Sequence, residues 1–460
     1  MRFKLKPKLI YPMEPISPYP GSCLIIKEAV ISTNINRLDS RPAGPVNLRS
    51  HLILANQCTI PPPPTDYGST PTTFLSLGTV FLVACAAKSS PAFLLSAMAD
   101  ELLLYDGEVS ATIAGFPTIY HFQPSAKLAQ SEGHKPLIVC IPGACHLGRI
   151  FYGGHEGSNS RNFLAYQLSQ LGFNVLSLSY PLEIGDLMPT TAAYFRIPDW
   201  GRQAAVTTKK VIDEKGLTTR SIVLMGWSMA GRMPVPFNIT AKELGLDVQQ
   251  FISLSATPGI SGIRAATPRL PCSEAGYFSM PPRLEDFYKQ LEEMEALNGC
   301  KDIIPRGIYL REYTGGMPVS LQAYGLKYAG KGSFSKDDVV HEHETKVFDI
   351  SNHALIAALY PTSILDPVHA LTDKTTWGFL MTLKLESRVR QILSSVDGPP
   401  AWQKLKDLIE SAPNRLCLPV SGNHFFFVGE ESARGAAEAV CKLIEETRKF
   451  QEELYNLSGT

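Results

Sequence analysis

The sequence lacks the features that mark several broad classes of protein. Among its 460 residues, 43 lysines and arginines balance 43 aspartates and glutamates, so the formal net charge is zero. A chain without a basic excess gives no support to nucleic-acid binding or to electrostatic docking on a membrane. The nine cysteines are scattered and form no C-x-x-C pair. We therefore expect neither a disulfide framework nor a zinc site, and a cytoplasmic protein with reduced thiols is the default.

Long apolar runs are also scarce. One uncharged stretch, PTTFLSLGTVFLVACAA at residues 71–87, is short for a membrane span and contains several threonines and serines. A buried helix, a weak interfacial anchor and non-native sequence are the alternatives, and we expect no stable membrane span. The proline-dense segments before it lack helical or alternating periodicity. Residues 1–97 are therefore expected to be a low-order extension, and Met98 opens the first domain-like segment.

From about residue 100 the chain alternates between strand-like and helix-like segments. This alternation predicts an α/β fold with a mostly parallel central sheet flanked by helices. The first two strands are also compatible with an antiparallel pair, and Asp199 is a suitable N-cap for the second helix. The expected strands are residues 101–109, 116–122, 136–144, 173–181, 221–228 and 251–259, and the expected helices are 162–172 and 199–216.

The stretch SIVLMGWSMAGRM places Ser228 directly after a strand-like run. Gly226 and Ala230 stand two residues before and two residues after it, where larger side chains would collide across a tight strand-to-helix turn. Such a turn holds the serine in a strained conformation with its hydroxyl exposed, as in a nucleophile elbow. A serine that only caps the following helix is the alternative, so the rest of the sequence must decide between them.

The turn after the strand at 136–144 is a candidate oxyanion hole. Acyl-transfer enzymes need two backbone N–H groups aimed at the developing oxyanion, one from the residue after the nucleophile and one from this turn. Met229 and Ala144 are the expected donors, and Cys145 is the neighbouring candidate. The alternative is a simple glycine turn.

The C-terminal stretch LCLPVSGNHFFFVGEES supplies a candidate base. Its strand breaks at Gly422 and presents His424 on a loop, and neighbouring parallel strands end at the same sheet edge. His424 is therefore expected to act as the base for Ser228.

The base also needs a carboxylate partner. In SRVRQILSSVDGPP, a strand-like run ends at Asp397, one helix before the histidine strand. Serine, acid and histidine would then follow the chain order of an α/β-hydrolase. Asp397 is the expected acid, although an ordinary turn aspartate is the alternative, and Asp366 in ILDPVHA is the reserve candidate.

Residues 261–385 exceed what the core sheet requires. Two stretches within them, MPPRLEDFYKQLEEMEALNG and HALIAALYPTSILDPVHAL, both read as helix. An insertion at this place is expected to cover the pocket as a lid and to exclude water from it. The HEHE sequence at 341–344 has no third placed ligand, so we expect no metal there.

Taken together, these motifs resemble the α/β-hydrolase superfamily, of the serine esterase and thioesterase type, over roughly residues 100–260 and 385–455. PGACHLGRIF resembles the H-G-A-x-H turn of plant-type esterases and hydroxynitrile lyases, and GWSMAG resembles their G-H-S-x-G elbow. Pro142 and Trp227 replace the usual histidines, and Ala230 replaces the usual glycine. The resemblance implies core segments at 98–260 and 386–460 around a helical lid at 261–385, with no metal or organic cofactor.

The function expected from the sequence is hydrolysis of a small-molecule carboxylic ester or thioester through an acyl-enzyme intermediate. An acyltransferase or a lyase using the same triad is an alternative. A non-catalytic ligand-binding protein on the same scaffold is another, because a fold alone does not determine a function.

Overall fold

The computed structural model describes residues 104–127, 135–263, 272–322, 325–337, 343–393, 396 and 398–457. The chain divides into two units, Met1–Phe93 and Leu94–Thr460, and the described residues all belong to the second. The expected extension at 1–97 and the apolar stretch at 71–87 lie outside them. Over the described ranges, no helix combines the length and apolar character needed to cross a membrane.

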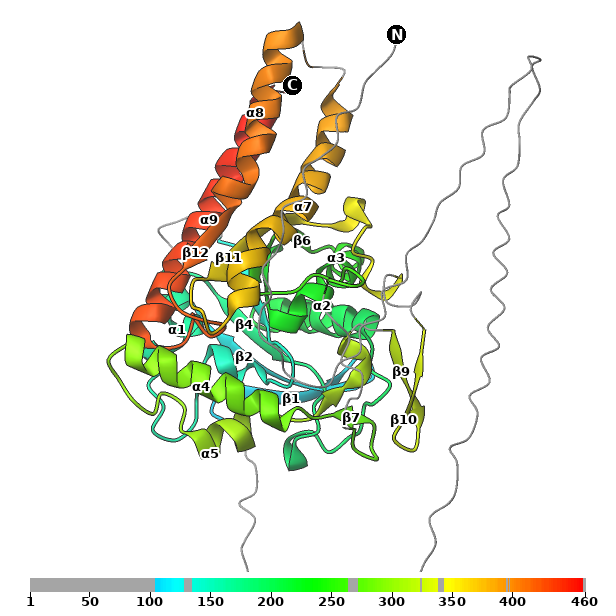
Figure 1. The fold of residues 1–460 in the computed structure, drawn as a ribbon, viewed down its shortest axis with the longest axis vertical. Coiled ribbons are helices and arrows are strands. Elements are labelled where there is room, and N and C mark those ends of the chain that lie inside the picture. Colours follow the sequence, from blue (N-terminus) through cyan, green and yellow to red (C-terminus); the bar gives the residue numbers. More distant parts are fainter. Residues whose placement is uncertain are drawn as a thin grey trace, which may run out of the picture. The chain divides into compact units, whose positions relative to one another are not determined.

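One eight-stranded sheet forms the centre of the second unit (Figure 1). At one edge of the sheet three successive strands pair antiparallel, and all the other neighbouring strands pair parallel. The expected mostly parallel sheet is therefore confirmed, including its antiparallel start. In spatial order the strands are β1 (Glu108–Ile113), β2 (Phe116–Gln123), β4 (Val175–Ser179), β3 (Leu137–Ile141), β5 (Ser221–Trp227), β6 (Asp247–Leu254), β11 (Leu355–Pro361) and β12 (Cys417–Val420).

Helices cover both faces of this sheet, which explains why strands near its centre are buried on both faces. Every residue of β3 and β4 is buried, as parallel strands between two helical layers require. Figure 1 shows one pair of helices on each side of the sheet, and the two helices of each pair contact one another. The pairs are α1 (Leu164–Gln170) with α9 (Glu430–Leu457), and α2 (Ile197–Glu214) with α3 (Pro234–Glu243).

Helix α2 begins at Ile197, two residues before Asp199. Its N-cap is Arg196, whose backbone N–H donates to the Asp199 carboxylate at 3.1 Å. Asp199 therefore occupies the N3 position of a capping box, and the expectation that it is the N-cap is wrong. A carboxylate in the first turn still interacts favourably with the helix dipole.

The chain between β6 and β11 forms an insertion beside the core. The helix expected from MPPRLEDFYKQLEEMEALNG is present as α4, so that part of the expectation is confirmed. A one-turn helix, α5, leads into a π-helical turn at Tyr309–Tyr313. The regular elements are α4 (Pro281–Leu297), α5 (Arg306–Ile308), the pair β7 (Tyr277–Phe278) and β8 (Met317–Pro318), and the hairpin β9 (Leu326–Gly330) and β10 (Ser333–Lys336).

The core resumes at Leu355, so the expected boundary at 385 lies too late in the chain. The run LIAALYP, expected as helix, is β11, which pairs in parallel with β6 on one side and β12 on the other. A short apolar run with alanines suits either a helix or a buried strand, and partners distant in sequence decide between them.

Two long helices follow β11. The first, α7 (Pro367–Ile392), packs on β11 and contains most of the run expected as a strand before Asp397, so that strand assignment is wrong. The second, α8 (Gly398–Leu416), contacts both α7 and α9.

A buried ion pair joins the first strand to the turn after β3. Arg149 donates from Nε and Nη2 to the two carboxylate oxygens of Glu108, both at 2.7 Å, and both side chains are fully buried. The Tyr152 hydroxyl donates to the same carboxylate, and the Tyr105 ring lies 3.5 Å from the guanidinium carbon. This cluster anchors the segment that follows the candidate oxyanion turn.

Candidate active site

The backbone at Ser228 has the geometry of a nucleophile elbow. Strand β5 ends at Trp227, and Ser228 has a φ of +55°, in the left-handed region that non-glycine residues rarely occupy. A 3-10 turn over Ser228–Arg232 then leads into α3, whose N-cap is Met233. Ser228 therefore does not cap α3, which removes the alternative reading of this serine.

The elbow requires small residues on both sides of the serine. A Cβ atom added to Gly226 would lie 2.9 Å from the Phe251 ring and 3.2 Å from the Ala230 carbonyl oxygen. A Cβ atom at Gly231 would lie 2.5 Å from the carbonyl oxygen of Thr257. Ala230 itself is fully buried, so a methyl group fits at a position where such elbows more often have glycine.

The turn after β3 packs directly against this serine. A Cβ atom at Gly143 would lie 2.7 Å from the Ser228 Cβ and 3.3 Å from its Oγ. The Tyr180 hydroxyl donates to the Gly143 carbonyl at 2.8 Å, which ties the turn to the residue after β4. Ala144 and Cys145 therefore both remain candidates for the second oxyanion donor beside Met229.

Cys145 and His146 are structural members of this turn. Burial raises the pKa of the Cys145 thiol to about 12, so the thiol is neutral at physiological pH. Burial lowers the pKa of His146 to about 3, and its ring nitrogens contact the Ala144 carbonyl at 2.7 Å and the Tyr309 hydroxyl at 2.8 Å. The neutral His146 ring thereby ties the turn to the inserted segment.

His424 forms a hydrogen bond with a buried aspartate. Its Nδ1 lies 2.8 Å from Oδ2 of Asp366, and both residues are buried. Burial lowers the pKa of His424 below its usual value, while Asp366 opposes that shift. Burial also disfavours the charge on Asp366, but the attraction of His424 and the hydrogen bonds outweigh it and lower the carboxyl pKa to about 2. The pair is therefore a neutral imidazole and an ionised carboxylate near neutral pH.

The acid beside His424 is thus the reserve candidate and not Asp397. Asp397 itself lies outside the described residues, but Nδ1 of His424 is already occupied by Asp366, so the assignment of this role to Asp397 is corrected. Asp366 follows β11 and is the N-cap of α7, at the sheet edge where β5 also ends. The sequence signal for Asp366 is an acid just after an apolar run, but the alanines in that run also suit a helix.

Two elements hold the histidine loop in place. The Trp227 indole donates to the His424 carbonyl oxygen at 2.9 Å, which ties the loop to the residue before Ser228. From α4, Gln290 accepts from the His424 N–H at 3.2 Å, and the Phe287 ring stacks on the imidazole at 5.7 Å with an interplanar angle of 3°. Sequence reasoning missed both α4 contacts, because nothing local marks a residue that acts across the insertion.

No hydrogen bond joins the Ser228 hydroxyl to His424 within the described part of the chain. In enzymes that use a serine and a histidine together, that bond is often long before substrate binds and shortens in the complex. Trp227, the residue before Ser228, links the two residues, because the centre of its ring lies 5.2 Å from the centre of the His424 ring.

A second histidine lies close to this pair. His369 contacts the Asp373 carboxylate at 2.9 Å, and Asp366, His369 and His424 offer potential metal-ligand atoms within 4.8 Å of one another. Hydrogen bonds already engage the Nδ1 atoms of both histidines.

The other histidine cluster gives no metal site among the described residues. The first half of the HEHE sequence, 341–342, lies outside them. In the second half, Glu344 forms an ion pair with Arg196 at the start of α2.

The strand order, with its antiparallel second strand, and the strained serine after β5 together decide the architecture. The fold is that of the α/β-hydrolases. The chain order of Ser228, Asp366 and His424 is also the order in which that fold places its serine, acid and histidine.

No family model and no curated protein matches the chain. Among solved structures, it is similar to MenH from S. aureus, with 13% identity, a TM-score of 0.37 and coverage of 72% of this chain and 98% of that chain. It is similar to a thioesterase domain from the curacin biosynthetic pathway, with 13% identity, a TM-score of 0.37 and coverage of 73% and 98%. An arylesterase gives 11% identity, a TM-score of 0.38 and coverage of 74% and 84%. At these identities and TM-scores, the similarities do not indicate an activity for this chain.

Proposed function

We propose that this protein is a serine hydrolase that cleaves a carboxylic ester or thioester through an acyl-enzyme intermediate. The observation that carries the proposal is the His424–Asp366 hydrogen bond at the sheet edge where Ser228 sits on a strained elbow. A strained serine beside an oriented, buried imidazole is the arrangement that activates a hydroxyl nucleophile.

In the proposed mechanism, the Ser228 oxygen attacks the substrate carbonyl carbon and His424 Nε2 takes the hydroxyl proton. Asp366 stabilises the imidazolium that forms, and the backbone N–H groups of Ala144 and Met229 stabilise the oxyanion. The intermediate expels the alcohol or thiol, which receives the proton from His424. Water activated by the same histidine then hydrolyses the acyl-enzyme.

The insertion between β6 and β11 is proposed to cover the acyl or alcohol side of this site. Its helix α4 supports this placement, because Phe287 and Gln290 contact the catalytic histidine directly. A cover in this position would exclude water while the acyl-enzyme forms.

Labelling with a fluorophosphonate tests the proposal. The wild-type protein is expected to react, because the probe phosphonylates serines activated by a neighbouring base, and Ser228→Ala is expected to abolish the labelling. Ser221→Ala is the matched control, since Ser221 lies at the other end of β5. Folded wild-type protein that takes no label would contradict the proposal and favour a ligand-binding role.

The pH dependence of kcat/KM reports the state of His424. The base must be neutral, and burial places its pKa below the usual 6.5, so activity is expected to be constant near neutral pH and to fall only at lower pH. Asp366, with a pKa of about 2, stays ionised over that range. Initial rates with a short p-nitrophenyl ester give the profile, and an acid limb centred above pH 7 would be inconsistent with this assignment.

A further inference from the structure

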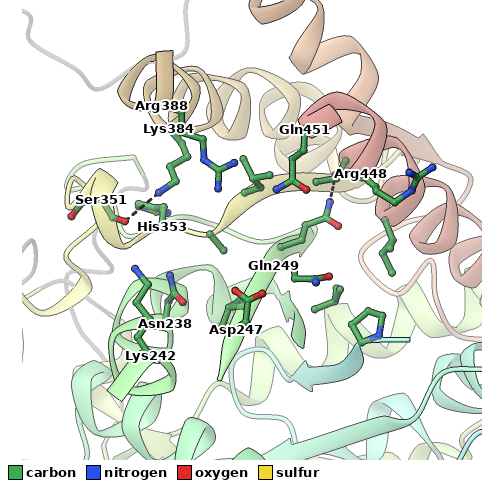
Figure 2. A pocket seen from close by; sticks show the side chains of 18 of the residues that line it. Asn238, Lys242, Asp247, Gln249, Ser351, His353, Lys384, Arg388, Arg448 and Gln451 are labelled. Atoms are coloured by element: carbon green, nitrogen blue, oxygen red, sulfur yellow. Dashed lines mark hydrogen bonds between the residues drawn. The ribbon is translucent and has the colours of Figure 1, made fainter. Parts of the chain in front are cut away.

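A cavity opens at the sheet edge opposite the serine. Its volume is about 750 Å³, and it lies at the amino ends of β6 and β11, whereas Ser228 follows the carboxyl end of β5. Helices α3, α7 and α9 contribute to its wall, as Figure 2 shows. Pockets of 300–1,000 Å³ are typical of small-molecule sites.

Three cationic side chains line this cavity from two helices. Lys242 extends from α3, and Lys384 and Arg388 extend from α7 on the other side of the space (Figure 2). Asp247 is the one carboxylate among the described lining residues. A fourth cation, Arg448, is already paired with Glu445 and Glu452 on its own helix. The wall is therefore positively charged overall.

The charges on α7 are poorly compensated. Lys384 is 8% exposed, and its ammonium group donates to the carbonyl oxygens of Ile350 and Ser351, at 3.0 and 3.2 Å. Burial and the neighbouring Arg388 and Lys242 lower its pKa to about 8, against a smaller opposing effect of Asp349. Burial also lowers the pKa of Arg388. An anion in the cavity would relieve this repulsion.

The guanidinium of Arg388 is available for a ligand. Within the described residues it makes no hydrogen bond or ion pair, although the charge of Asp247 acts on it. Guanidinium groups bind phosphate or carboxylate oxygens through two parallel N–H donors, and a partly desolvated guanidinium does so most strongly.

The cavity continues into a groove of about 1,010 Å³ between α7 and α9. The two spaces share four polar residues, Arg388, Gln391, Arg448 and Gln451. The groove adds apolar surface from Ile392, Leu454 and Tyr455. An anionic head group in the cavity could therefore carry an organic group that lies along this groove.

We propose that this cavity binds the phosphate group of a phosphorylated small organic molecule. Arg388 would hold two phosphate oxygens, and Lys384 and Lys242 would balance the remaining charge of a dianion. A single carboxylate would leave most of this positive charge unbalanced. The site is separate from the Ser228 site and does not depend on the proposed hydrolase activity.

Isothermal titration of the full chain with phenyl phosphate, inorganic phosphate and benzoate tests this site. Phenyl phosphate is expected to bind saturably and more tightly than inorganic phosphate, because its ring reaches the apolar groove. Benzoate, which has the ring but a single charge, is expected to bind more weakly than both. Arg388→Gln is expected to weaken phenyl phosphate binding about tenfold or more.

Arg390→Gln is the matched control, because Arg390 lies on the same helix, is exposed and pairs with Glu386. It removes the same charge and is expected to leave binding unchanged. Lys242→Gln, at an exposed position of α3, gives a second test that does not disturb the core, and a smaller weakening is expected. Ser228→Ala is expected to bind normally.

Three results would overturn this proposal. The first is an absence of saturable binding of either phosphate compound to wild-type protein. The second is an equal loss in Arg388→Gln and Arg390→Gln, which would indicate a general charge effect. The third is benzoate binding as tightly as phenyl phosphate, which would refute the assignment to phosphate.

Discussion

Asp366→Asn is expected to lower turnover by about 10³- to 10⁴-fold while the protein remains folded. The amide keeps the shape of the carboxylate but offers Nδ1 of His424 the wrong hydrogen-bonding partner. It also removes the negative charge that stabilises the imidazolium in the transition state. Steady-state hydrolysis of a p-nitrophenyl ester measures the loss, and circular dichroism checks the fold.

Two matched variants make this experiment specific. Asp373→Asn alters another buried aspartate, in α7, whose carboxylate contacts a different histidine, His369. Asp397→Asn alters the acid that the sequence favoured. Both are expected to retain turnover within about tenfold of wild type. A large loss in Asp397→Asn with a small loss in Asp366→Asn would reverse our assignment of the acid.

Glu108→Gln is expected to lower the free energy of unfolding by about 3–5 kcal/mol. The substitution removes the carboxylate charge that pairs with the fully buried guanidinium of Arg149, and Arg149 lies in the segment that follows the candidate oxyanion turn. Urea unfolding monitored by tryptophan fluorescence measures the change.

Glu453→Gln is the control for this stability prediction. It removes a partly exposed carboxylate that pairs with Arg415, whose guanidinium keeps Glu446 as a second partner, and a loss of less than about 1 kcal/mol is expected. If the two variants lost similar amounts, the buried pair would contribute no more than a surface pair does.

The local patterns around the proposed serine and base were readable in the sequence. Gly226 and Ala230 indicate the elbow because steric exclusion acts within a few residues of Ser228. His424 stands out because the strand, the glycine break and the long helix that surround it are contiguous. The alternation of apolar segments likewise predicted most strands of the parallel sheet.

The acid could not be chosen in the same way. Two apolar runs, one before Asp366 and one before Asp397, are both candidates for the same strand of the sheet. The first contains alanines and was read as helix, and the second was read as strand, but the structure has them the other way round. The composition of such runs favours helix and strand about equally. The pairing of β11 with β6 and β12 therefore decides which run forms the strand.

The sequence by itself therefore determined the α/β class, the order of most core elements, and Ser228 and His424 as candidates, because short-range sterics and hydrophobic periodicity carry that information. Only the tertiary structure decided that Asp366 meets His424, that α4 supports the histidine loop, and that Lys242 and Arg388 face one cavity. These relations join residues far apart in the chain. They depend on which strands pair and which helices pack together, and no local pattern encodes that choice.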